Sequence, residues 1–146
     1  MRLCVMGVLW LAAVSLAGAV DLKQIQAEPN LERRSKLALE HASAALQEAR
    51  EAYRNGDNDK VAALAAEIQE AVELASASLK QTNKDPRRSP KYFKNAEIAT
   101  RDLLRKLDTF QQDMSFADRP VLDKVKERVQ QVHDDLLLGL MEGKRK

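Results

Sequence analysis

Apolar residues recur at spacings of three and four along four stretches of the chain, with polar residues between them. In residues 30–55 the repeating positions include Leu39, Ala42, Leu46 and Ala49. Such spacing places the apolar side chains on one face of an α-helix. The stretches 58–82, 90–114 and 119–141 show the same period, through Val61, Leu64, Ile68 and Val72, then Phe93, Leu103, Leu107 and Phe110, then Leu122, Val125, Val129 and Val132. The pattern predicts four long helices.

Turn-forming residues separate these stretches. Asn30 and Ser89 are good N-caps, Pro90 suits a first helical turn, and Asp118 is a plausible N-cap for the last helix. The short turn at residues 55–58 makes the first two helices an antiparallel hairpin. We therefore expect an all-α fold, a four-helix up-down-up-down bundle made of two long antiparallel helical hairpins. The bundle should occupy residues 29–142, between a flexible lead at 20–28 and a basic tail at 143–146.

The first hairpin is rich in alanine along the face that its helices share. Alanine lets helices approach closely, but each alanine buries little apolar area, and burial contributes only about 25 cal/mol per Å². The larger residues of the last helix, such as Val129 and Val132, complement these alanines. We expect the two hairpins to need each other for a stable core.

Residues 1–19 are typical of a bacterial Sec-type signal peptide. Arg2 begins the segment, an apolar run follows from Val5 to Leu16, and Ala17-Gly18-Ala19 matches the small-x-small cleavage pattern. We expect cleavage after Ala19 and a periplasmic or secreted protein; the alternative is an uncleaved N-terminal anchor. Cleavage would remove Cys4, the only cysteine, and leave no transmembrane span. A disulfide, a thiolate nucleophile and a cysteine-bound metal are then excluded.

Charge is balanced overall but unevenly distributed. Residues 28–79 carry 6 basic and 10 acidic side chains, whereas residues 80–106 carry 9 basic and 3 acidic ones. The overall balance gives no reason to expect specific nucleic-acid binding. Three Glu/Asp–Lys/Arg pairs stand four residues apart in the favourable order and predict ion pairs on helix surfaces: Glu32–Lys36, Glu97–Arg101 and Asp102–Lys106.

The basic segment is the main candidate for a partner- or anion-binding surface. On a helix, most of its residues share an arc opposite the Phe93–Phe110 seam, and an apolar residue, Ile98, lies within that arc. One interpretation is the ordinary solvated face of an amphipathic helix. The other is a site for an anionic partner, since guanidinium groups suit carboxylates and phosphates. The candidate residues are Lys84, Arg87, Arg88, Lys91, Lys94, Ile98, Arg101 and Arg105.

A second candidate surface is the apolar end of the last helix. Residues 136–141 are apolar nearly all round, and one helix seam cannot bury every side chain. Either the N-terminal lead folds over them or a second protein does, which includes a homodimer. The residues expected at this apolar interface are Leu137, Leu138, Leu140 and Met141.

Catalytic and metal motifs are absent from the sequence. His41 and His133 lack the i,i+4 or Glu-x-x-His spacing of metal sites in helical bundles, so solvated positions beside the seams are the simplest interpretation. No serine stands in a Gly-x-Ser-x-Gly context, and no glycine cluster could cradle phosphate. We therefore expect no enzyme, no cofactor and no metal ligands.

One turn resembles a known repeat. Ala52-Tyr53, Gly56-Asp57 and Asp59-Lys60-Val61 are similar to the turn of a tetratricopeptide repeat. The resemblance covers about ten residues, and no copy follows at the 34-residue period of that family. It implies a helical adaptor.

These observations predict an exported, non-catalytic helical module that serves interaction or structure. Its partner would be another envelope or secreted macromolecule, an anionic one if the basic face binds it. The alternatives are a bundle that senses a metal or a small ligand, and a tetratricopeptide-like adaptor.

Overall fold

The computed structural model describes residues 21–143 of the chain, and all secondary structure in this range is helical. The elements are α1 (Leu22–Gln26), α2 (Leu31–Arg54), α3 (Asn58–Gln81), α4 (Pro90–Asp113), the 3₁₀ helix η1 (Arg119–Leu122) and α5 (Asp123–Glu142). The predicted all-α four-helix bundle is confirmed. The signal peptide, its cleavage site after Ala19 and most of the basic tail lie outside the described residues.

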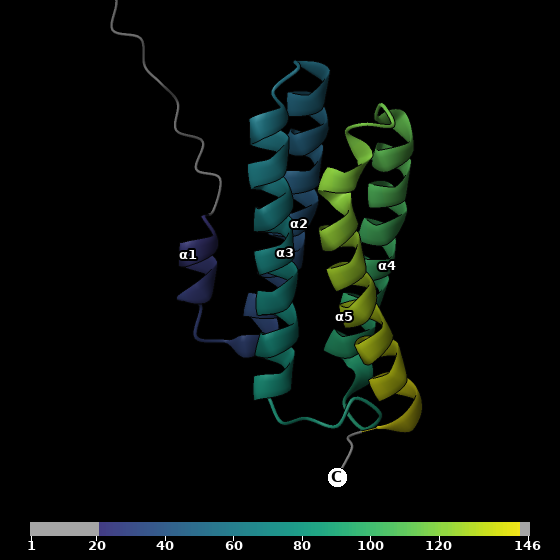
Figure 1. The fold of residues 1–146 in the computed structure, drawn as a ribbon. Helices are drawn as coiled ribbons and strands as arrows, with labels where there is room; N and C mark the ends of the chain where they lie inside the picture. Colours follow the sequence, from purple (N-terminus) through teal and green to yellow (C-terminus); the bar gives the residue numbers. More distant parts are fainter. Residues whose placement is uncertain (1–20, 144–146) are drawn as a thin grey trace, which may run out of the picture.

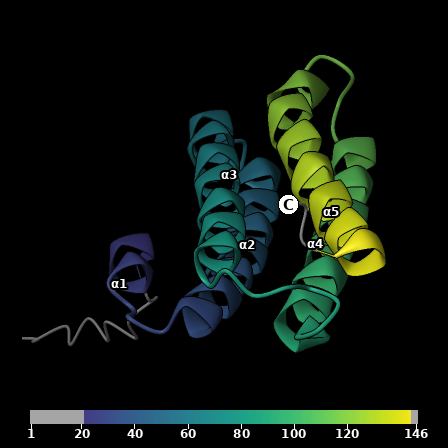
Figure 2. The ribbon, with the colours of Figure 1, turned by 90° about the horizontal axis from the view of Figure 1, so that it is seen from below.

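The four long helices alternate in direction and form two hairpins, α2/α3 and α4/α5 (Figure 1). The hairpins lie side by side, with α2 against α4 and α3 against α5. Both of these pairs are parallel. The linker at residues 82–89 therefore runs diagonally beneath the bundle from α3 to α4, as seen from below in Figure 2. It brings the start of α4 and the end of α5 to one end of the molecule.

The core is one continuous cluster that draws on both hairpins. Small residues of α2, including Ala38, Ala42 and Ala49, are fully buried. Larger residues such as Leu107 of α4 and Val129 of α5 are buried with them. Small and large side chains can interdigitate in this way at the density of a protein interior. The expected interdependence of the hairpins therefore has a structural basis in a shared core.

The prediction of a flexible N-terminal lead is wrong for the described residues 21–28. They form the short helix α1, which packs against α2 and buries Leu22 and Ile25. Nε of Arg34 donates to the carbonyl oxygen of Glu28 at 2.9 Å and fixes the connection. Two apolar residues three positions apart are too few to show a period in the sequence. Figure 1 shows α1 on the side of the α2/α3 hairpin away from α5, so these residues do not cover the end of α5.

Of the three predicted N-cap residues, one makes a side-chain capping bond and two do not. Asn30 caps α2 by accepting a hydrogen bond from the backbone N–H of Arg33 at 2.9 Å. Pro90 occupies the first turn of α4, but the side chain of Ser89 makes no capping bond. Asp118 does not cap the last helix either, because η1 intervenes and α5 begins only at Asp123.

The carboxylate of Asp118 has another role. Its Oδ2 atom accepts hydrogen bonds from the hydroxyl of Tyr53 at 3.0 Å and from that of Ser115 at 2.7 Å. The Tyr53 hydroxyl in turn accepts from the backbone N–H of Ser115 at 2.8 Å. These bonds join the end of α2 to the α4–α5 turn and hold the two hairpins together at the end opposite the linker.

Candidate functional site

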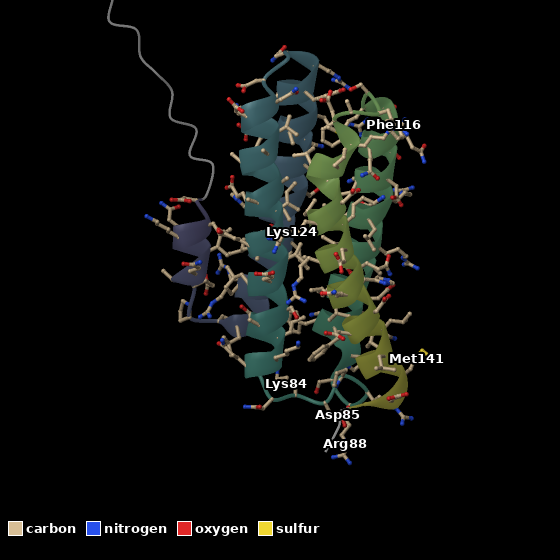
Figure 3. All side chains as sticks on the ribbon, viewed as in Figure 1. Lys84, Asp85, Arg88, Phe116, Lys124 and Met141 are labelled. Carbon is tan, nitrogen blue, oxygen red and sulfur yellow. The ribbon has the colours of Figure 1, made fainter. Side chains whose placement is uncertain are left out.

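The linker between α3 and α4 is an ordered turn. Oδ1 of Asp85 accepts from the backbone N–H of Arg87 at 2.9 Å, and the Asp85 carbonyl accepts from the N–H groups of Arg88 and Ser89 at 3.1 and 2.9 Å. Arg87 and Arg88 are consequently displayed on the outside of a fixed backbone. Figure 3 shows Lys84, Asp85 and Arg88 together at this end of the bundle.

Part of the predicted basic surface is neutralised by ion pairs. Nζ of Lys84 binds the carboxylate of Glu32 on α2. Arg101 lies 3.7 Å from Glu97, and Arg105 lies 2.5 Å from Asp102. These three cations already have acidic partners, so they are poor candidates for binding a further anion.

Two of the three predicted i,i+4 ion pairs form and one does not. Glu97–Arg101 and Asp102–Lys106 form, the latter at 2.7 Å. Hydrogen bonds from Lys106 and Arg105 hold the pKa of Asp102 below its usual value. Glu32 instead binds Lys84 from the linker, which leaves Lys36 to pair with Glu40 at 3.7 Å. The tertiary contact between Glu32 and Lys84 of the linker explains why Lys36 has a different partner from the one predicted.

The remaining four cations form what we call the basic end: Arg87, Arg88, Lys91 and Lys94. All four side chains are exposed, and none forms an ion pair with a carboxylate of residues 21–143. Nζ of Lys91 lies 5.3 Å from the centroid of the Tyr92 ring, a cation–π contact that leaves its charge uncompensated. The basic end is thus a compact group of free positive charges in the linker and the first turn and a half of α4.

The last turn of α5 packs directly on the linker. A Cβ atom at Gly139 would lie 3.3 Å from Cγ of Pro86, and one at Gly143 would lie 3.1 Å from Cδ of Arg87. Gly143 also has a φ of +82°, which side-chain-bearing residues rarely adopt. The two glycines therefore permit a close approach that puts the end of α5 beside the basic end.

Most of the predicted apolar interface is exposed. Leu137, Leu138 and Met141 are exposed, Met141 to 68%. Leu140 is the exception, since it is partly buried against the core. Ile98 of α4, which lies in the predicted basic arc, is 53% exposed. We call the four exposed residues the apolar tips: Ile98, Leu137, Leu138 and Met141.

The register of α4 against α5 places Leu137, one of the apolar tips, next to the basic end. Nε2 of His133 lies 3.0 Å from Oε1 of Glu97, so these residues are opposite each other in an antiparallel pair. Leu137 is one turn beyond His133 on the same face. It therefore lies beside the turn of α4 that precedes Glu97, and this turn contains Lys94. Two surfaces that appear separate in the sequence therefore adjoin, a relation that no sequence signal revealed.

The histidines are helix-bridging residues rather than solvated ones. Nε2 of His41 on α2 lies 2.6 Å from Oε1 of Glu67 on α3, and His133 and Glu97 join α5 to α4 in the same way. Each hairpin thus has one partly buried His–Glu contact. Within residues 21–143, no group of three or more His, Cys, Asp or Glu side chains is arranged to hold a metal ion.

A groove of about 290 Å³ lies between the parallel helices α2 and α4. Its apolar residues include Leu39, Tyr92, Ala99 and Leu103, and polar groups such as Ser43 and Asn95 also line it. This combination of an apolar surface with a few polar groups is typical of small-molecule sites. The sequence did not indicate the groove, because it depends on which hairpin faces are in contact.

Comparison with known proteins adds no relative. A scan against protein-family models and searches of characterised proteins and of solved structures found no match to this chain.

In the turn that resembles a tetratricopeptide repeat, the Tyr53 ring packs edge-on against Phe110, with centroids 5.9 Å apart. Among the described helices, none has both the length and the apolarity that crossing a membrane requires.

Proposed function

We propose that this protein is an exported, non-catalytic helical-bundle module that binds an anionic partner at the cell envelope through its basic end. The observation that carries the proposal is the division of the cations by ion pairing. Lys84, Arg101 and Arg105 have carboxylate partners, whereas the four residues of the basic end have none in the described part of the chain.

Free cations are better suited to binding than paired ones. An anion that approaches Arg101 must compete with Glu97, whereas Arg88 forms no ion pair with a carboxylate of residues 21–143. Guanidinium groups can also bind phosphate or carboxylate in a bidentate manner. The linker backbone is already fixed by Asp85, so less conformational entropy is lost on binding.

Two further observations support the rest of the proposal. The pattern of residues 1–19 supports export. A non-catalytic role is supported by the positions of the histidines, because each is engaged with a glutamate of the neighbouring helix in its own hairpin. Bridging between helices accounts for both residues as structural elements.

The test is binding of the mature chain to long-chain polyphosphate, measured by fluorescence anisotropy across a range of salt concentrations. Two double variants remove the same charge, R87A/R88A from the basic end and R101A/R105A from the ion-paired face. We expect R87A/R88A to weaken binding and to reduce the slope of log affinity against log salt by about 2, whereas R101A/R105A changes it little. Equal effects of the two variants, or no binding by the parent protein, would contradict the proposal.

A second candidate, binding of a small ligand, is favoured by the α2–α4 groove. A substitution that fills the groove, Ala99→Trp, should abolish stabilisation by any small molecule that raises the melting temperature of the parent protein. R87A/R88A should leave that stabilisation intact, because Arg87 and Arg88 do not line the groove. A thermal-shift screen of small apolar molecules is the measurement. Stabilisation that survives Ala99→Trp places the ligand elsewhere.

A further inference from the structure

The shared end of α4 and α5 combines positive charge with exposed apolar side chains, and we infer that its partner is an anionic phospholipid surface. The inference rests on the proposed function and specifies its partner. The cations of the basic end would bind lipid phosphates, while the apolar tips enter the headgroup region. The protein would then be a peripheral one, held at the surface by a charged and apolar patch.

The apolar tips are distributed among charges rather than collected in a groove. On α4, Ile98 stands four residues after Lys94 and three before Arg101, so cations flank it on the same helix face. A groove of about 300 Å³ exists at this end, but its walls include Leu79, Phe93 and Leu136 and none of the apolar tips. The tips project outward, as Figure 3 shows for Met141 at the outer edge of the bundle.

This arrangement of side chains is better suited to a lipid bilayer as the binding partner than to a folded protein. Isolated projecting side chains need a separate pocket for each on a rigid partner, whereas the headgroup region of a bilayer is fluid and accommodates them individually. Long Lys and Arg side chains can reach lipid phosphates while their aliphatic portions stay in apolar surroundings. Charge complementarity then selects anionic over zwitterionic lipid.

Four acidic residues near this surface make contacts with groups other than the charged side chains of the basic end. Glu97 contacts His133 and Arg101, and Asp85 accepts hydrogen bonds from the linker backbone. Asp135 lies 3.7 Å from Lys80. Asp134 is exposed, 3.3 Å from His133, and accepts from Gln130. Glu142 also has an interaction partner.

Three basic residues follow the end of α5 in the sequence. Gly143 is followed directly by Lys144, Arg145 and Lys146. These residues are covalently joined to the end of α5, which packs on the basic linker. Clusters of basic residues beside an apolar helix surface are a common sequence signature of binding to anionic lipid.

The test is co-sedimentation of the mature chain with vesicles of phosphatidylcholine, with and without phosphatidylglycerol, alongside the polyphosphate assay. We expect binding only to the vesicles that contain phosphatidylglycerol. R87A/R88A should weaken vesicle binding about 25-fold, at roughly fivefold for each cation. L137S/M141S should weaken it about tenfold while leaving polyphosphate binding unchanged, because it removes only the apolar contribution.

Phe116 provides the matched apolar control. It is 87% exposed and lies at the opposite end of the bundle (Figure 3), so Phe116→Ser should alter neither assay. Binding to polyphosphate without binding to vesicles would overturn the lipid inference and leave the proposed function standing. Binding to neither polyphosphate nor vesicles would contradict both the proposed function and the lipid inference. If L137S/M141S binds vesicles like the parent protein, or turns a dimer into a monomer in sedimentation velocity, the apolar tips do not contact lipid and the inference is wrong.

Discussion

The short helix α1 offers a direct test of the structure, because the sequence pattern led us to expect a flexible lead there. Ile25 is 2% exposed and packs in the core against α2, together with Leu22. Ile25→Ala removes three carbon atoms from this contact. At about 0.8 kcal/mol for each buried methylene equivalent, the loss of transfer free energy is about 2.4 kcal/mol.

Two effects modify this value in opposite directions. A cavity left at a rigid site adds to the loss, and Ile→Ala substitutions in cores cost about 2–5 kcal/mol. However, α1 has only five residues and joins α2 through a short connection. If the substitution releases α1 altogether, the loss cannot exceed the free energy with which α1 docks. We therefore expect a loss of about 2–3 kcal/mol.

Urea unfolding followed by circular dichroism at 222 nm is the suitable assay, because the only tryptophan, Trp10, lies in the predicted signal peptide. Gln24→Ala is the matched control, since Gln24 is exposed on the same helix. A lower m-value for Ile25→Ala would show that α1 has already separated in the native state, because m scales with the surface exposed on unfolding. If the two variants agree within about 0.5 kcal/mol, the range of ordinary surface substitutions, α1 does not contribute to the fold as described.

The remaining predictions concern the Tyr53–Asp118 hydrogen bond and the ion pairs of Asp102 on α4. Tyr53→Phe keeps the ring but removes the hydroxyl that donates to Asp118. Urea unfolding should show that the free energy of unfolding falls by about 1–2 kcal/mol. An unchanged midpoint would show that this bond does not hold the hairpins together. Asp102→Asn removes a carboxylate whose pKa is lowered by Lys106 and Arg105. Its stabilising effect is therefore complete above its ordinary pKa of 3.8 and is lost as pH falls through the lower folded value. Because the side chain is 37% exposed, we expect at most about 0.5 kcal/mol at pH 7, and a stability difference that grows on acidification would contradict this sign.

Local ion pairing explains why the basic segment cannot be judged from its net charge. Residues 80–106 carry a large positive excess, yet several of their cations are held by carboxylates. The pairs within α4 follow helix spacing and could be predicted. The Lys84–Glu32 pair joins the linker to α2 and depends on the tertiary fold. Only the complete set of pairs shows that, within residues 80–106, the cations without a carboxylate partner are confined to the linker and the start of α4.

The candidate site could be predicted in parts but not as a whole. Helix periodicity placed Ile98 in the basic arc and Leu137 in an apolar segment that one seam cannot bury, but it left their exposure open; both side chains are exposed. Leu140 was expected in the same interface but packs against the core. The adjacency of Leu137 and the basic end depends on the register set by His133 and Glu97, and these residues are 36 positions apart in the chain.

The sequence by itself determined the helical fold and its division into two hairpins. The signals for this are local: apolar residues at spacings of three and four, Asn30 as a cap and Pro90 in a first helical turn. Each depends only on the backbone geometry of its own segment. Tertiary structure decided which hairpin faces meet, how the linker crosses the bundle and which cations remain unpaired. These outcomes depend on packing between residues far apart in the chain, such as Gly139 against Pro86 and Tyr53 against Phe110. Helix periodicity fixes the face on which a side chain lies, whereas its neighbour on another helix is fixed only when the core closes.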